Sequence, residues 1–152
     1  MCRNENIKNI IDKTSNQSIN KGWNNPKNIA YAESHDEERL MYNNQQYGAS
    51  NGSYDVTTLT TALERIAALG AITLTIPGPK MIWQFGELGY DISIDYDCRV
   101  CPKPVLWEYY DDWRRKRLYD VYSVLIDLKK NYDVFRTEDF ELDVRLAMKS
   151  IK

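Results

Sequence analysis

The sequence has no excess of basic residues and no long apolar run, and each shortage excludes a class of protein. Lys and Arg number 20 against 22 Asp and Glu, so the formal net charge is −2. Without a basic patch to neutralise phosphate groups, nucleic acid is not an expected partner. No apolar run approaches the ~18 residues of a membrane-spanning helix, and the first residues lack the apolar region of a secretory signal. We therefore expect neither a nucleic-acid nor a membrane partner, and the compartment of the protein is unknown from these residues.

Cysteine and histidine are also scarce, and their spacing argues against a metal site. The three cysteines are Cys2, Cys98 and Cys101, and the single histidine is His35. Cys98 and Cys101 form one C-x-x-C pair, which is half of a zinc site and lacks the second pair that would complete it. An odd number of cysteines gives no disulfide framework either. We expect no metal, and the sequence leaves open whether Cys98 and Cys101 are free thiols or one loop disulfide.

The only histidine lies in the stretch around which the chain is organised, residues 28–39. A short apolar run over 29–32 stops at a cluster of ionisable residues that contains His35 and Asp36. This pattern is typical of a buried strand with polar side chains at its carboxyl end, where α/β proteins place their chemistry. A strand that runs into a solvated acidic turn is the alternative interpretation. A long loop over 37–54 should follow, and loops of this length are usually functional or mobile.

The first helix is predicted from a run of apolar residues spaced three and four apart. It should begin near Ser53 or Asp55, both good N-cap residues, and end at Pro77. Gly70 lowers its helix propensity and allows close packing at that point. The expected buried stripe comprises Val56, Leu59, Leu63, Ile66 and Ala67.

A second strand-like run over 80–85 stops at a polar turn, as the first run does. The last clear helix should begin near Asp111 or Asp112. Its expected buried stripe comprises Leu118, Val121, Tyr122, Leu125, Ile126 and Leu128, and its expected wet side comprises Arg114, Arg115, Lys116, Lys129 and Lys130. After residue 131 the period changes, and short strands are predicted over 134–135 and 140–148.

The order strand, helix, strand, helix predicts an α/β fold with parallel strands and helical crossovers. Two such units cannot close a sheet, and a (β/α)8 barrel needs about 200 residues or more. Strands buried on both faces would leave open edges if they stood alone. On these grounds the 152 residues are expected to be part of a larger protein. The isolated chain is expected to self-associate through its open sheet edges or to cover them by compensating pairing.

Several segments together resemble the alpha-amylase family of glycoside hydrolases. Residues 31–39 (YAESHDEER) resemble the family's last active-site motif, which ends the seventh barrel strand. The other similar segments, in the family's order, are 76–89 (eighth strand and turn), 103–109 (before the eighth helix) and 117–133 (the eighth helix). The resemblance implies that residues 1–133 are the C-terminal part of a catalytic TIM barrel, with the seventh and eighth βα units, and that 134–152 begin a C-terminal β-domain.

The resemblance also implies a retaining mechanism on α-1,4-glucans such as starch, glycogen and maltooligosaccharides, with three carboxylates. Asp36 matches the acid that stabilises the transition state, and His35 matches a residue that binds the same sugar. No residue matches the nucleophile or the general acid/base, which the family places on strands that would precede Met1. Ser34, which directly precedes the His-Asp pair, differs from the Asn that is commoner at this position in the family. The isolated chain is therefore expected to be inactive. Calcium is common in relatives, so the full-length protein could bind it, but no ligand cluster for calcium is recognisable in these residues. The family resemblance is compatible with a secreted or periplasmic full-length protein.

Three further residues are candidates for sugar contact. Arg39 could pair with Glu33, with a carboxylate of the rest of the barrel, or in a surface ion pair worth at most about 1 kcal/mol. Tyr42 is the best candidate for a platform under a sugar ring. Glu87 follows a strand end and is a candidate for lining the cleft. Because the family keeps an acid there beside the barrel rim, a structural, hydrogen-bonding role is the favoured expectation for it.

Two other functions stay open. The aromatic richness, with eleven Tyr and four Trp, would also suit a non-catalytic carbohydrate-binding or interaction fragment. A truncated reading frame with no independent role is the third possibility, and the coding sequence upstream of Met1 would decide it.

Overall fold

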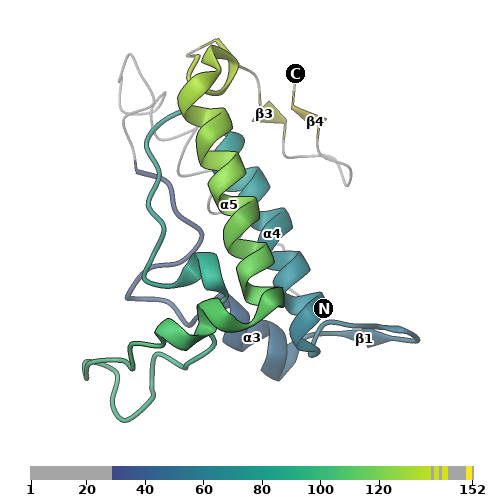
Figure 1. Ribbon diagram of the computed structural model, residues 1–152, viewed down its shortest axis with the longest axis vertical. Helices are drawn as coiled ribbons and strands as arrows, with labels where there is room; N and C mark the ends of the chain where they lie inside the picture. Colours follow the sequence, from purple (N-terminus) through teal and green to yellow (C-terminus); the bar gives the residue numbers. More distant parts are fainter. Residues whose placement is uncertain (1–28, 138, 141, 144–149, 152) are drawn as a thin grey trace.

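The computed structural model describes residues 29–137, 139–140, 142–143 and 150–151, and two long helices dominate it. The helices, in chain order, are α3 (Leu40–Tyr47), α4 (Leu59–Thr75), η2 (Gly86–Leu88), η3 (Trp107–Asp111), α5 (Trp113–Asn131) and η4 (Asp133–Phe135). The strands in the described part form two antiparallel pairs, β1 (Ser50–Asn51) with β2 (Tyr54–Asp55) and β3 (Leu142–Asp143) with β4 (Ser150–Ile151). Figure 1 shows α4 and α5 side by side and running in the same direction, with α3 against the start of α4.

The main core lies between α4, α5 and α3. Its buried members are Met41, Ala62, Leu63, Ile66, Leu74, Leu118 and Tyr122. The predicted stripe of the first helix is confirmed, because Leu63 and Ile66 are buried in this core while Leu59 and Ala67 pack against it. The stripe of the second helix is confirmed at Leu118 and Tyr122, which are buried, and its other four members are half-buried. None of the helices in the described ranges is long and apolar enough to cross a membrane.

Gly70 allows the close approach of α4 and α5, as predicted. A Cβ at this position would lie 2.7 Å from Cε2 and 2.8 Å from Cζ of Tyr122. In an open helix Gly→Ala stabilises by about 0.5–1 kcal/mol. Here the methyl group must displace a buried ring, so we expect Gly70→Ala to destabilise the protein by about 1–3 kcal/mol.

Urea unfolding of Gly70→Ala measures this cost, and the double variant Gly70→Ala with Tyr122→Leu is its matched control. Without the ring, the new methyl group has space, and the Gly→Ala step should become neutral or stabilising. A Gly70→Ala step with the same sign and size in both backgrounds would show that Tyr122 is not the obstacle.

The boundaries of both long helices follow from local signals, with one displacement. Asp112 caps α5 by accepting from the Arg114 backbone N–H at 2.9 Å, as predicted. α4 ends before Pro77 but begins at Leu59, later than predicted. The carboxylate of Asp55 instead accepts from the backbone N–H and hydroxyl of Thr57, at 2.9 and 2.7 Å, and so forms a turn ahead of the helix.

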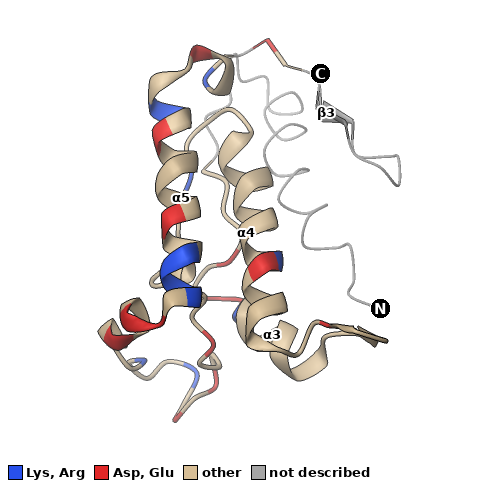
Figure 2. Cartoon of the chain, turned by 45° about the vertical axis from the view of Figure 1, so that its right-hand side comes forward, with Lys and Arg blue, Asp and Glu red and all other residues tan. Residues whose placement is uncertain are grey.

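The clearest wrong assignment on the wet side of α5 is Arg115. Charges of both signs are spread along α5, whereas α4 carries few (Figure 2). Arg115, expected among the exposed residues, is only 6% exposed and forms an ion pair with Asp91 at 2.7 Å. Arg115 lies on the same face of α5 as the apolar stripe. Its partners lie outside α5, so the spacing of residues within the helix could not predict them.

The expected long loop over 37–54 is wrong, because this segment contains α3 and the β1–β2 hairpin. The two strands pair Ser50 with Asp55 and Asn51 with Tyr54. Gly52 takes a φ of +62°, the conformation that a two-residue hairpin turn needs and that glycine adopts at little cost. α3 has a polar sequence with a single buried residue, Met41, so its sequence has no apolar stripe from which the helix could be predicted.

The two strand-like apolar runs meet in parallel but do not extend into strands. Ala30 and Lys80 form one parallel bridge. The Ala30 N–H donates to the Pro79 carbonyl at 3.0 Å, and the Met81 N–H donates to the Ala30 carbonyl at 3.0 Å. The second run ends at Phe85, whose φ of 57° is left-handed and leads into η2. The parallel direction is as predicted, while the barrel portion and self-association through sheet edges remain predictions.

The end of the chain differs from its prediction at one point. The strand expected over 134–135 is wrong, because η4 occupies this position. Of the strand expected over 140–148, only Leu142–Asp143 is described as a strand, and residues 138, 141 and 144–149 lie outside the described residues. Cys2 also lies outside them. The domain boundary between 133 and 134 remains a prediction.

Two lysines gather where the chain leaves α4 and α5. Lys80 Nζ donates to the carbonyls of Pro77 and Gly78 at 3.0 and 2.9 Å. Lys129 Nζ donates to the carbonyl of Ile76 at 2.8 Å, although Lys129 was expected on the wet side. Burial, and to a smaller extent repulsion from Lys129, lowers the pKa of Lys80 to about 7.

This depressed pKa predicts a pH dependence of stability. Between about pH 7 and the ordinary lysine pKa of 10.5, the unfolded chain holds a proton on Lys80 that the folded chain has released. Stability should therefore rise with pH in this window. Lys80→Met cannot titrate and so lacks this effect. From the low to the high end of the window, wild type should gain about 1–2 kcal/mol of stability relative to Lys80→Met. This gain is smaller than full burial would give, because the amine is partly exposed to water. Urea midpoints at the two ends of the window measure it, and a pH-independent difference would contradict it.

Candidate functional site

His35 and Asp36 lie in an exposed turn, the histidine turn (residues 34–38), a few residues after the parallel bridge. Their side chains are 70% and 77% exposed, and His35 Nε2 lies 3.3 Å from Asp36 Oδ1. The imidazole ring is 5.7 Å from the ring of Trp83, on the neighbouring run. Both residues border an open hollow of about 460 Å³. The predicted pair is therefore adjacent and accessible beside the end of the bridged segment.

The disulfide loop (residues 91–104) forms another part of the wall of the hollow. Cys98 and Cys101 are disulfide-bonded, which decides between the two states that the sequence left open. Lys103 Nζ donates to the carbonyls of Tyr96 and Cys98 at 3.1 and 2.5 Å, and to that of Cys101 at 3.2 Å. The disulfide and this lysine together close a compact loop in a segment that has no helix or strand of its own.

Short-range hydrogen bonds shape the histidine turn. Ser34 is buried, its hydroxyl donates to the carboxylate of Glu37, and it accepts from the Asp36 backbone N–H at 3.2 Å. Glu37 also borders the hollow, but its carboxylate is engaged by Ser34. The carboxylate of Asp36 is exposed and available to a ligand. The buried hydroxyl of Ser34 fixes the backbone of the turn through its bonds to Glu37 and Asp36.

A buried ion pair anchors both ends of the turn. Arg39 Nη2 lies 3.0 Å from Glu33 Oε1, and their side chains are 5% and 11% exposed. Arg39 also donates to the Gln84 carbonyl at 2.5 Å, and its guanidinium lies 4.8 Å from the centre of the Tyr90 ring. Of the three alternatives for Arg39, the structure therefore shows the pair with Glu33, buried rather than at the surface.

Burial shifts the pKa values of both partners of this pair. It raises the pKa of Glu33, an effect opposed by the positive charge of Arg39 and by the hydrogen bond from the Leu40 N–H. Burial also lowers the pKa of Arg39, opposed by the charge of Glu33. Within the described residues, the buried Nε of Arg39 has no hydrogen-bond acceptor. Each charge thus depends on the other for its stability in this environment.

Glu38 is a positioning residue that the sequence did not reveal. Its carboxylate accepts from the Ser93 hydroxyl at 2.6 Å and from the Ile94 backbone N–H at 2.9 Å. It also accepts from the Arg39 backbone N–H at 2.8 Å. Glu38 therefore links the histidine turn to the disulfide loop. Its partners are 55 and 56 residues away in the chain, and no local pattern signals them.

Two of the predicted sugar-contacting residues lie apart from the hollow. The side chains of His35, Asp36 and Arg39 border it, and those of Tyr42 and Glu87 do not. Tyr42 is half-buried on α3, and Glu87 is half-buried in η2. Their contact with a sugar remains a prediction.

The chemistry that the hollow supports is hydrogen bonding to hydroxyl groups. Asp36 offers an acceptor, His35 offers a donor or an acceptor, and Trp83 adds a flat aromatic face. In the part of the chain that the structure describes, no three His, Cys, Asp or Glu side chains gather where they could hold a metal ion.

Comparisons with known proteins supply no family. No protein-family model matches the chain, and no curated protein matches it significantly.

Proposed function

We propose that this chain supplies the seventh and eighth βα units of an alpha-amylase-type retaining glycoside hydrolase that acts on α-1,4-glucans. One observation carries the proposal: the Ala30–Lys80 bridge is parallel, and His35 and Asp36 follow its first segment to the border of an open hollow. The parallel course of α4 and α5 agrees with two consecutive βα units. The segment resemblance described above supplies the reaction class.

In this proposal Asp36 and His35 act on the sugar ring that is being distorted. A carboxylate aimed at ring hydroxyls accelerates the reaction when its hydrogen bonds strengthen as the ring flattens towards the oxocarbenium-like transition state. Asp36 suits this role because the histidine turn holds its backbone while leaving its carboxylate exposed. The nucleophile and the general acid/base would come from other strands of the same barrel.

The proposal predicts that this chain alone does not hydrolyse starch. A retaining mechanism needs a nucleophile and an acid/base about 5–5.5 Å apart, and Asp36 has no such pair beside it in the proposal. A reducing-sugar assay with soluble starch should give no release above a buffer control. Release by the wild-type chain that Asp36→Asn abolishes would contradict the assignment of the missing carboxylates.

The coding sequence upstream of the Met1 codon tests the rest of the proposal. We expect it, or a neighbouring gene, to encode further strand–helix repeats with an Asp and a Glu at strand ends. An upstream region that encodes no such repeats would contradict the barrel assignment and leave the binding function below.

A non-catalytic carbohydrate-binding function is the second candidate, and the exposed indoles favour it. Trp107 and Trp113 are 73% and 69% exposed, and flat indole faces suit stacking on sugar rings. Maltoheptaose binding that Trp113→Ala abolishes and Asp36→Asn leaves unchanged would support this candidate over the catalytic one.

A further inference from the structure

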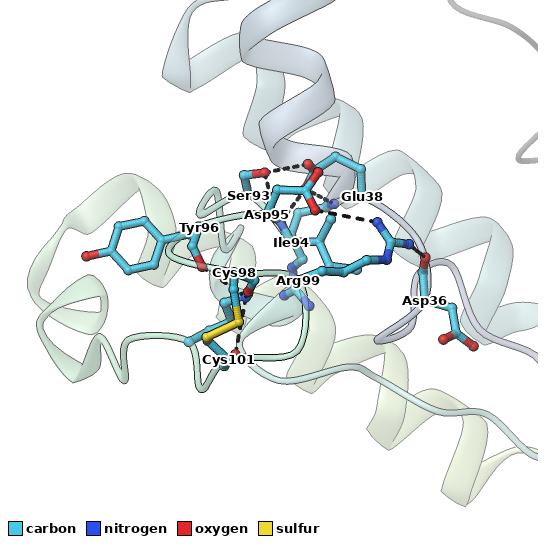
Figure 3. A network of polar contacts seen from close by, with 11 residues as sticks. Asp36, Glu38, Ser93, Ile94, Asp95, Tyr96, Cys98, Arg99 and Cys101 are labelled. Carbon is cyan, nitrogen blue, oxygen red and sulfur yellow. Dashed lines mark hydrogen bonds and ion pairs between the residues drawn. A yellow bond between two sulfur atoms is a disulfide. The ribbon is translucent and has the colours of Figure 1, made fainter.

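The disulfide loop is attached to the histidine turn at two points. Glu38 receives hydrogen bonds from Ser93 and Ile94 at the start of the loop. Five residues later, Arg99 Nη2 donates to the backbone carbonyl of Asp36 at 2.7 Å. Figure 3 shows Arg99 reaching from the loop towards Asp36, with the disulfide on the side away from Asp36. The second attachment is at the proposed catalytic aspartate itself.

The contact leaves the functional group of Asp36 free. Arg99 bonds the main-chain carbonyl, whereas the carboxylate is 77% exposed. A second guanidinium nitrogen, Nη1, lies 3.6 Å from Asp95 Oδ1, so the charge of Arg99 is balanced within its own loop. Arg99 therefore fixes where the Asp36 backbone lies without competing for the carboxylate.

The contact by itself is weak, because the Arg99 side chain is 59% exposed. A hydrogen bond contributes about 0.5–1.5 kcal/mol net, and an exposed one lies at the low end because water competes for both groups. What keeps Arg99 in place is the loop: it lies between the two bonded cysteines, and Lys103 holds the carbonyls of both. A donor on a constrained loop loses less conformational entropy when it bonds than a donor on a free loop.

We propose that Arg99 is a positioning residue for Asp36 and that the Cys98–Cys101 disulfide keeps Arg99 in its bonding position. The structural part of this inference stands on the contacts above, and its consequence for sugar binding rests on the proposed function. Opening the disulfide, which converts the two bonded sulfurs to two thiols at the expense of an added reductant, should uncouple Arg99 from Asp36.

Nuclear magnetic resonance of the ligand-free chain tests the coupling, because His35 is the only histidine and its ring lies beside Asp36. Arg99→Ala and the double variant Cys98→Ser with Cys101→Ser should each shift the imidazole proton and carbon signals. Arg99→Lys should restore part of the wild-type position. Adding Arg99→Ala to the cysteine double variant should produce little further change, and Lys116→Ala on the exposed face of α5 should produce none.

Unchanged imidazole signals in Arg99→Ala would overturn the proposal, as would cysteine and arginine effects that simply add. Urea midpoints close to that of wild type would show that the signal shifts come from a local change and not from partial unfolding. If the cysteine double variant fails to fold, the comparison of Arg99→Ala with Arg99→Lys tests the positioning role of Arg99.

A second readout separates this inference from the proposed function. Maltoheptaose should bind about three- to tenfold more weakly to Arg99→Ala than to wild type, the loss expected for one hydrogen bond. If the imidazole signals shift as predicted while wild type binds no maltoheptaose, the positioning role stands and the proposed function fails. If wild type binds and Arg99→Ala binds equally well, the positioning role fails.

Discussion

Replacing Arg115 with alanine should lower the free energy of unfolding by about 3–5 kcal/mol, because the change leaves the largely buried carboxylate of Asp91 without its cationic partner. Arg115 pairs with Asp91 at 2.7 Å, and the side chains of the two are 7% and 15% exposed. Its Nη1 also donates to the carbonyls of Leu88 and Gly89, and its guanidinium stacks 3.7 Å from the centre of the Tyr109 ring. One side chain therefore joins α5, η2 and the start of the disulfide loop.

Two variants make this prediction specific. Arg115→Lys keeps the charge but loses the planar fork that reaches the carboxylate and two carbonyls, and it should cost about 1–3 kcal/mol. Lys116→Ala, at the next position, removes an exposed pair with Asp120 and should cost less than about 1 kcal/mol. Urea unfolding ranks the three, and equal losses at positions 115 and 116 would refute the role given to Arg115.

The second large effect is expected at Arg39. Arg39→Ala should destabilise the protein by about 3–5 kcal/mol, since it leaves Glu33 charged and buried beside apolar groups. The removed guanidinium also supports the Gln84 carbonyl. Because Arg39 directly follows the histidine turn, we expect its loss to loosen His35 and Asp36 as well.

A double-mutant cycle tests the pairing directly. Glu33→Ala alone should also be strongly destabilising, and the double variant should cost less than the sum of the two, with a coupling of about 1–3 kcal/mol. Replacement of the pair by leucine and methionine should recover part of the loss, as apolar replacements of buried ion pairs often do. Additive single effects would show that the two charges do not interact in the folded state.

The sequence predicted those features that depend on local pattern. Period three and four identified the buried faces of α4 and α5, Asp112 identified the start of α5, and Pro77 identified the end of α4. The direction of the Ala30–Lys80 pairing followed from the alternation of strand and helix. These signals lie within one element or in the order of elements, so one sequence suffices to read them.

The features that were missed depend on partners distant in the chain. Arg115 bonds groups 24–27 residues away, and helical period alone placed it among the exposed residues. The pair of Arg39 with Glu33 was among the alternatives that the sequence offered, but its burial and the bond to the Gln84 carbonyl, 45 residues away, were missed. Glu38 was missed for the same reason. The residues of the disulfide loop that border the hollow were missed because the shape of this loop depends on the disulfide, and the sequence left that bond undecided.

The measurement that tests the central claim most directly is a maltoheptaose titration of the chain, monitored through the imidazole signals of His35. This single histidine lies beside Asp36 on the border of the hollow, so its signals report on that place alone. We predict saturable shifts in the millimolar range that Asp36→Asn abolishes and that a β-1,4-linked glucan oligosaccharide does not cause. Imidazole signals that stay fixed throughout the titration, or that move equally with both sugars, would contradict the assignment of His35 and Asp36 to an α-glucan site.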